Sequence, residues 1–358
     1  MEQSSALAVD AGRNALPGTV PNPEAARRRD VRAHRAAIIF ALFLGMAILG
    51  LAEWQALKLL PDQVSVRLLG HSLNVRQLHQ RFANNAALIF FLLPAALILE
   101  GAIVGWTRCS ARQLLFRPTA SGKTDVACFL LGQAHILDVA GRLLMLGASM
   151  LSGVWIRDWL ASTFGVSINL GPLPMPLQVV AYFFVYSFFD YWTHRLDHSR
   201  LFWPLHRYHH AADEFSVVNA TRQHPAAFTA IFFINMPMAV LGAPPAVILY
   251  VNVLTTALGF VIHSKIDSDF GWIGRYVIQS PTHHRLHHIL DISEQPAGHF
   301  AMAPIWDHLF GTWRGDADQS LAIGVDTPYR HGFWVVPDLL RDYLDFWKGF
   351  IPRRRATP

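Results

Sequence analysis

The feature that most constrains this chain is a series of long apolar runs that carry almost no charge. Residues 36–52 and 226–262 contain no charged side chain, and residues 86–106 contain only Glu100. Further apolar runs occupy residues 125–156 and 173–189, and Gly242 to Pro245 divide the longest run into two helices. Because a helix needs about 20 apolar residues to cross a bilayer, the sequence predicts an all-α, integral membrane helical bundle with about four to six spans.

The distribution of charge agrees with a membrane protein. Charged residues make up 15% of the chain, against about 25% in ordinary soluble domains. The net charge of +5 comes from two terminal groups of arginines, at residues 27–35 and 353–355. A nucleic-acid-binding protein carries basic side chains across a folded face, so the sequence predicts the membrane, and no nucleic acid, as the partner.

The same arginines predict an orientation. By the positive-inside rule, residues 27–35 and the basic loop at residues 108–123 lie in the cytoplasm. The count of spans then places the N-terminus, the segments after residues 189 and 262, and the C-terminus on the cytoplasmic side. The alanine- and arginine-rich composition favours a bacterial inner membrane.

Histidines are concentrated in one part of the chain. Eleven of the eighteen lie between His194 and His288, and eight of these are spaced so that each group lies on one helix face. The three groups are His194 with His198, then His206 with His209 and His210, and finally His284 with His287 and His288.

Imidazole groups at this spacing predict a metal site. Neutral imidazole binds Zn, Fe, Cu and Ni, and eight ligands exceed the four of a tetrahedral zinc, so two metals with open positions are expected. His224 and His263 lie beside the same predicted cytoplasmic face and are candidates to complete the ligand set. His283 is one residue out of phase with its neighbours and is left out of the predicted site.

The chain resembles the fatty acid hydroxylase / sterol desaturase superfamily in several segments. These are 190–198 (DYWTHRLDH), 206–210 (HRYHH), 222–225 (RQHP), 263–266 (HSKI), 280–288 (SPTHHRLHH) and 306–312 (WDHLFGT). Two positions depart from the family pattern. His299-Phe300-Ala301 replaces the usual Asn-Tyr-Gly, and Ala226-Ala227 replaces a carboxylate that often follows the Arg-x-His-Pro segment.

The composition and apolar runs, together with the resemblance over about residues 174–314, predict a domain organisation. Residues 1–35 are expected to form a disordered basic tail, and residues 36–170 the N-terminal membrane spans. Residues 171–315 are expected to form the catalytic domain, in which a cytoplasmic helical cap carries the histidine boxes. Residues 316–358 form a C-terminal tail with a helix that lies at the membrane interface or packs on the cytoplasmic domain.

The resemblance also implies an activity. It predicts a non-haem di-iron oxygenase that hydroxylates a lipid C–H bond with O2 as co-substrate and electrons from a separate cytochrome b5-, ferredoxin- or reductase-type protein. The expected iron ligands are the eight box histidines with His263 and His224. Asp190, Asp197, Asp213 and Asp307 are candidates to orient these ligands.

Two other functions stay open. A lipid desaturase of the same family, acting on a sterol or a fatty acyl chain, begins with the same hydrogen abstraction. A membrane metal transporter would place its ligands within the spans, whereas the apolar runs contain none of the eight box histidines. The chain has no Glu-x-x-His motif, which argues against a carboxylate-bridged di-iron bundle.

Overall fold

The computed structural model describes eight stretches of the chain and a few single positions at residues 44–59 and 170. The stretches are residues 61–68, 71–75, 78–133, 139–166, 172–227, 229–290, 298–315 and 322–351. The chain divides into two compact units, residues 1–57 and 58–358, and every element named below belongs to the second unit. The predicted tail and nearly all of the predicted first span, residues 36–52, lie outside the described residues.

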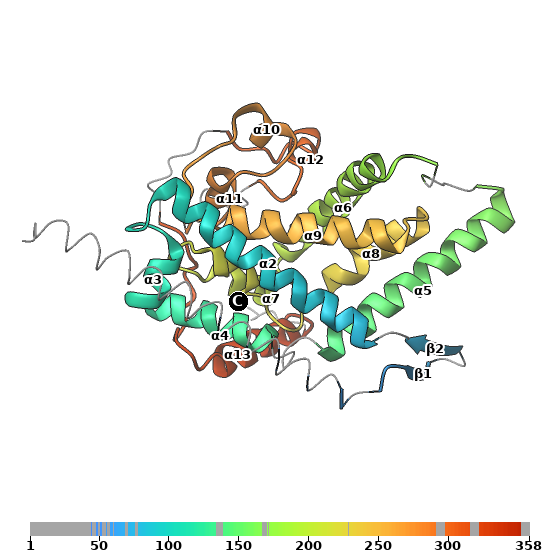
Figure 1. The fold of residues 1–358 in the computed structure, drawn as a ribbon, viewed down its shortest axis with the longest axis horizontal. Coiled ribbons are helices and arrows are strands. Elements are labelled where there is room, and N and C mark those ends of the chain that lie inside the picture. The colour runs from blue at the N-terminus through green and yellow to red at the C-terminus, as the bar shows by residue number, and fades with distance from the viewer. Residues whose placement is uncertain are drawn as a thin grey trace, which may run out of the picture. The chain divides into compact units, whose positions relative to one another are not determined.

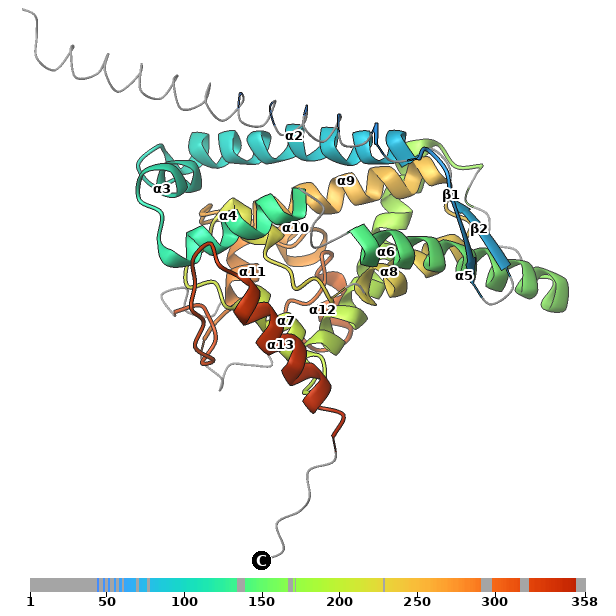
Figure 2. The ribbon, with the colours of Figure 1, turned by 90° about the horizontal axis from the view of Figure 1, so that it is seen from below.

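The second unit begins with a small β-hairpin, which the sequence did not predict. Strand β1 (Val64–Leu68) pairs antiparallel with β2 (His71–Val75), so that Val64 lies opposite Val75. Helix α2 (Leu78–Val104) follows and lies along α9 (Pro245–Ile262) (Figures 1 and 2). Apart from this hairpin and one isolated bridge, the described elements are helical, which confirms the predicted all-α class.

Glu100 in α2 faces protein and is fully buried. Its carboxylate accepts hydrogen bonds from the N–H of Ser110 at 2.6 Å, the hydroxyl of Ser110 at 2.7 Å and the N–H of Lys265 at 2.7 Å. The single acidic group of this apolar run therefore fastens α2 to α3 (Ser110–Phe116) and to the segment that follows α9.

The apolar run at residues 125–156, predicted as one span, is divided between two helices. These are α4 (Ala120–Gln133) and α5 (Val139–Phe164), and residues 134–138 between them are not described. Gly153 allows α5 to approach α8 (Thr229–Val240) closely, because a Cβ at this position would lie 2.6 Å from the carbonyl oxygen of Met236.

Three long helices supply the apolar core behind the histidines. Helices α8 and α9, which Gly242 to Pro245 separate as predicted, both pack against α6 (Met175–Asp197). Tyr182 of α6, Met238 of α8 and Val251 of α9 are fully buried in this core. The packing fixes the C-terminal ends of α6 and α9 relative to each other, and both ends carry histidines.

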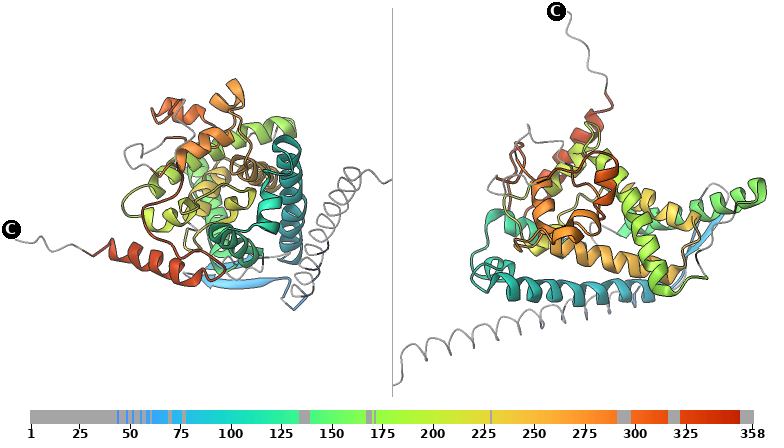
Figure 3. Two further views of the ribbon diagram at one scale, coloured as in Figure 1. Left: turned by 90° about the vertical axis from the view of Figure 1, so that its left-hand side faces the viewer. Right: turned by 90° about the horizontal axis from the view of Figure 1, so that it is seen from above.

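Short helices complete the second unit. They are α7 (Trp203–His210), the 3-10 helix η1 (Val217–Thr221), α10 (Gly271–Tyr276), α11 (Pro281–His287) and α12 (Ile305–Leu309). Helices α10, α11 and α12 gather near one end of α9, as the views of Figure 3 also show. Helix α13 (Val336–Lys348), which the sequence predicts as an interfacial or packed helix, packs against α7.

None of the helices in the described part of the chain is both long enough and apolar enough to cross a membrane. This differs from the four to six spans that the apolar runs predict.

Candidate metal centre

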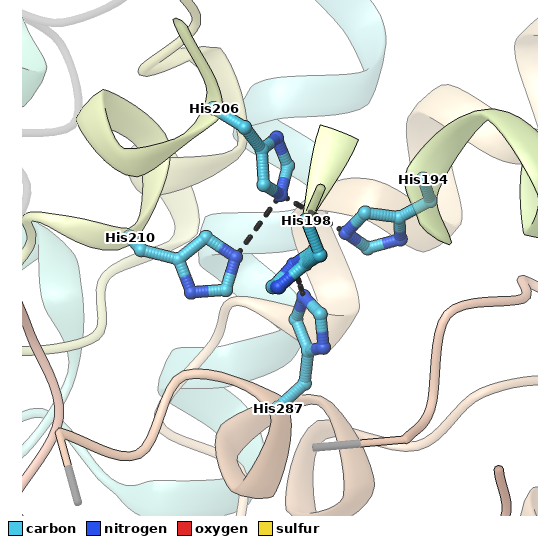
Figure 4. A group of neighbouring side chains, drawn as sticks. All are labelled: His194, His198, His206, His210 and His287. Atoms are coloured by element: carbon cyan, nitrogen blue, oxygen red, sulfur yellow. Dashed lines mark hydrogen bonds between the residues drawn. The ribbon is translucent and has the colours of Figure 1, made fainter. Parts of the chain in front are cut away.

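Nine histidines converge in two buried clusters. The five-histidine cluster contains His194, His198, His206, His210 and His287 (Figure 4), and the four-histidine cluster contains His209, His263, His284 and His288. In each cluster one nitrogen from every ring lies within 4.8 Å of the corresponding nitrogens of the other rings. The structure therefore brings together nine of the ten predicted site residues.

Eight of the nine side chains come from the C-terminal ends of four helices, and the ninth, His206, lies one turn earlier in α7. The last turns of α6, α7 and α11 carry most of them, and His198, His263 and His288 are the residues that cap α6, α9 and α11. Because the carbonyl groups at a helix C-terminus carry partial negative charge, four such ends favour a bound cation.

The two HxxHH boxes are each divided between the clusters. His206 and His210 lie in the five-histidine cluster, while His209 from the same box lies in the four-histidine cluster. In the last box, His284 and His288 lie in the four-histidine cluster, whereas His287 lies in the five-histidine cluster. The rings of His210 and His288 stack with their centroids 4.1 Å apart, so the two clusters are in contact.

The Nε2 atoms point inward in both clusters. The Nε2 atom of His206 lies 3.1 Å from that of His194 and 3.0 Å from that of His210, and the Nε2 atoms of His198 and His287 lie 3.2 Å apart (Figure 4). In the four-histidine cluster, the Nε2 atom of His284 lies 2.9 Å from that of His263 and 3.2 Å from that of His288.

Backbone carbonyl groups orient several rings from the outside. The Nδ1–H groups of His194 and His287 donate to the carbonyl oxygens of Phe300 at 2.7 Å and Gly298 at 3.1 Å. The Nδ1–H of His263 donates to its own helix, to Gly259 at 2.7 Å. These bonds place the proton on Nδ1 and leave the lone pair of Nε2 facing the centre of the cluster, which is the tautomer that binds metal through Nε2.

Burial keeps the clustered histidines neutral. Desolvation lowers the pKa of His194 and of His263 to about 4, and it lowers the pKa of the other seven well below the ordinary value. Inward-facing Nε2 atoms in groups of five and four cannot all be satisfied by hydrogen bonds to one another. A metal cation in each cluster would satisfy them, so the donor set fits two imidazole-bound metals.

Asp307 holds the segment that supplies two of these carbonyls. Its fully buried carboxylate accepts the N–H groups of Phe300 at 2.9 Å and Ala301 at 3.0 Å and the hydroxyl of Thr312 at 2.8 Å. Gly298 makes the same packing possible, since a Cβ there would overlap the carbonyl oxygen of Thr312. This carboxylate therefore acts on His194 and His287 through the backbone.

The other three candidate carboxylates differ in their surroundings. Asp197 lies 4.0 Å from Nδ1 of His206, within reach of a cluster ligand. Asp190 is hydrogen-bonded by the backbone of Met302, and burial raises its pKa to about 7. The backbone N–H of Asp213 donates to the hydroxyl of Ser121 at 3.4 Å.

His224 lies outside both clusters. Its Nε2–H donates to the carbonyl oxygen of Leu339 in α13 at 2.9 Å, and its Nδ1 accepts the N–H of Ala226 at 3.1 Å. Both ring nitrogens are therefore engaged, Nε2 in holding α13 and Nδ1 in a local bond to its own segment. The motif that contains His224 also contains Arg222, whose carbonyl oxygen lies 3.3 Å from Nδ1 of His209.

His283 and His299 form a separate pair beside the site. Their rings stack with an interplanar angle of 5° and centroids 5.2 Å apart, and both lie against Trp313. His299 is buried and has a positive φ of 64°. The sequence marked residues 299–301 as unusual, but it gave no signal that the carbonyls of Gly298 and Phe300 orient cluster histidines, because every residue has a carbonyl group.

Comparisons with known proteins match the same part of the chain. A family model described as fatty acid hydroxylase matches residues 179–312, which include all nine clustered histidines. The chain is 31% identical over 165 residues to the ornithine lipid hydroxylase OlsE of Rhizobium tropici, a match that covers 45% of this chain and 49% of that protein. It is 28% identical over 162 residues to the alkylglycerol monooxygenase of Danio rerio, covering 45% of this chain and 35% of that protein.

A shorter match, 32% identical over 80 residues, is to a C-4 methylsterol oxidase of Schizosaccharomyces pombe and covers 21% of this chain and 26% of that protein. The chain thus spans about a quarter to a half of the length of these relatives. No solved structure matches the chain.

Proposed function

Because residues 179–312 belong to the fatty acid hydroxylase superfamily, we propose that this protein is a di-iron oxygenase that hydroxylates a C–H bond of a lipid. The observation that carries the proposal is the pair of adjoining, buried clusters built from nine neutral imidazoles. The overall reaction consumes the lipid, O2, two electrons and two protons, and it yields the hydroxylated lipid and water.

Two iron ions would be held by the nine clustered histidines, one ion in each cluster. His194, His198, His206, His210 and His287 would hold the first, and His209, His263, His284 and His288 the second. Iron bound in this way supplies the one-electron chemistry with O2 that an unactivated C–H bond requires. His224, with both ring nitrogens engaged, is left out of the proposed ligand set.

The residues around the clusters prepare the site for this chemistry. The carbonyls of Phe300, Gly298 and Gly259 hold three rings in the tautomer with a free Nε2 lone pair. Phe300, which is 3% exposed, packs against His194, His198 and His287 and excludes water from one side of the five-histidine cluster. Dry surroundings protect an oxidising site from side reactions.

We also propose that the protein associates with a membrane, because a lipid substrate is located in a membrane. Large apolar side chains are exposed on α5, where Trp155 is 69% exposed, on α13, where Trp347 is 51% exposed, and just after α13, where Ile351 is 66% exposed. The composition favours the bacterial inner membrane, and the charge distribution favours an orientation with the N-terminus, the clusters and the C-terminus on the cytoplasmic side. A separate protein would deliver the electrons.

Comparative lipid mass spectrometry tests the proposal. Cells that express the protein, grown with oxygen, an electron donor and iron, are expected to contain a lipid with one added oxygen that is missing from cells with the His287→Ala variant. His308→Ala is a matched control, because His308 lies outside both clusters and its Nε2–H donates to the carbonyl oxygen of Arg275.

The product also distinguishes hydroxylation from desaturation. A lipid that loses two hydrogens, again only with the intact clusters, would identify a desaturase instead. Identical lipid profiles for the protein and the His287→Ala variant would refute both oxidations.

A further inference from the structure

A polar pocket of about 360 Å³ lies beside the four-histidine cluster. Its lining joins the segment after α9, with Ser264 and Lys265, to one face of α11, with Thr282 and Arg285. Ser264 and Lys265 directly follow His263, and Arg285 directly follows His284. The pocket is therefore built on the same two elements that supply cluster histidines.

Two polar atoms in this lining are buried without a hydrogen-bond partner. They are the hydroxyl oxygen of Thr282, a residue that is only 8% exposed, and the Nε atom of Arg285. In the described part of the chain, neither Lys265 nor Arg285 forms an ion pair within 4.0 Å, and Glu214 and Glu100 act on Lys265 only at longer range. The acidic residue in the lining, Asp267, is exposed. A hydroxyl group and a guanidinium Nε–H that lack partners, beside an ammonium group, are suited to binding an anionic oxygen group.

One aromatic ring contacts both the pocket and the cluster. The guanidinium carbon of Arg285 lies 5.4 Å from the ring centroid of Phe215. The centroid of the same ring lies 5.1 Å from that of His288 and 5.6 Å from that of His263. A group bound by Arg285 is therefore held about one ring away from the four-histidine cluster.

We propose that this pocket binds the anionic headgroup of the lipid substrate, with Arg285, Lys265 and Thr282 contacting its phosphate or carboxylate oxygens. The inference rests on the proposed function, because it assigns the substrate to the class of anionic lipids. Held there, the headgroup positions the adjoining part of the lipid near the metal centre, so oxidation is expected on or close to the headgroup end.

Binding of simple amphiphiles by the full-length protein in neutral detergent tests this assignment. Isothermal titration calorimetry compares dodecyl phosphate and N-lauroylglycine with uncharged dodecanol and with inorganic phosphate. At least one of the two anionic amphiphiles is expected to bind more tightly than both dodecanol and inorganic phosphate. Its Kd should rise about tenfold or more in Arg285→Gln and in Lys265→Gln, because each variant removes a charged hydrogen-bond donor.

Two controls separate the pocket from general effects. Arg275→Gln removes an exposed arginine of α10 outside the pocket and should leave the Kd unchanged. Arg285→Gln could disturb the neighbouring His284, so a second variant is needed. Thr282→Val keeps the side-chain volume and removes only the hydroxyl group of the pocket. Metal content, measured on each variant, reports such a disturbance directly.

Several results would overturn the inference. Equal affinity for dodecanol would remove the need for an anion, and equal affinity for inorganic phosphate would identify a site for free anions. A Kd unaffected by Arg285→Gln and by Lys265→Gln would place binding elsewhere. The His287→Ala variant is expected to keep headgroup binding while losing lipid oxidation, so failure of the proposed reaction and failure of the pocket assignment give different results.

Discussion

Arg222 and Asp125 form a fully buried ion pair that fastens α4 to the chain between η1 and α8. The Nη1 atom of Arg222 lies 3.1 Å from Oδ1 of Asp125, and both side chains have no exposed surface. Arg222 also donates to the hydroxyl of Ser121 at 3.0 Å and to the carbonyl oxygen of Tyr208 at 3.1 Å. Asn219 donates to the other oxygen of Asp125 at 2.5 Å.

Arg222→Met is expected to lower the free energy of unfolding by about 3–5 kcal/mol, because it leaves the Asp125 carboxylate buried without its cation. Asp125→Leu should have a cost of similar size, since it leaves the guanidinium without its carboxylate. The double variant leaves no buried charge. It removes the hydrogen-bond partner of four groups, at about 1 kcal/mol each: the side chains of Ser121, Asn219 and His331 and the Tyr208 carbonyl.

The double variant should therefore be destabilised by roughly 4 kcal/mol, below the sum of about 6–10 kcal/mol for the two single variants. Denaturant unfolding in neutral detergent, followed by tryptophan fluorescence, measures all three differences. Additive costs, or a cost below about 1 kcal/mol for Arg222→Met, would refute the view that this pair is a coupled, buried support of the fold.

Two further predictions concern the clusters. The iron content of each variant can be measured by mass spectrometry of the metal. It should be unchanged in His224→Gln and lower in His263→Gln. Iron loss in His224→Gln would place His224 among the ligands. The metal-free protein should lose stability as the pH falls from about 6.5 to about 4, because the pKa of His194 and of His263 is about 4 in the folded state and the unfolded chain takes up protons first. Each of these two groups contributes about 3 kcal/mol to the loss, and a denaturant midpoint that does not change across this window would contradict the assignment.

The sequence determined which histidines share one helix face within each box. Spacings of three and four residues place side chains on one helix face wherever the helix is located, so His206, His209 and His210 were predicted as neighbours from local geometry alone. The break at Gly242 to Pro245 was also predicted, because glycine followed by proline ends a helix through its own backbone restrictions.

Only the tertiary structure decided how the boxes combine. Helix packing places His209 in the four-histidine cluster and His206 and His210 in the five-histidine cluster. No pattern within a single helix specifies which histidine of a box joins which cluster. Helix packing also moves His224 away from the clusters to hold α13, and it places the carbonyls of Gly298 and Phe300 behind His287 and His194. The physical reason is that side-chain spacing is a local property, whereas the direction in which four helix ends meet depends on contacts between segments that are distant in the chain.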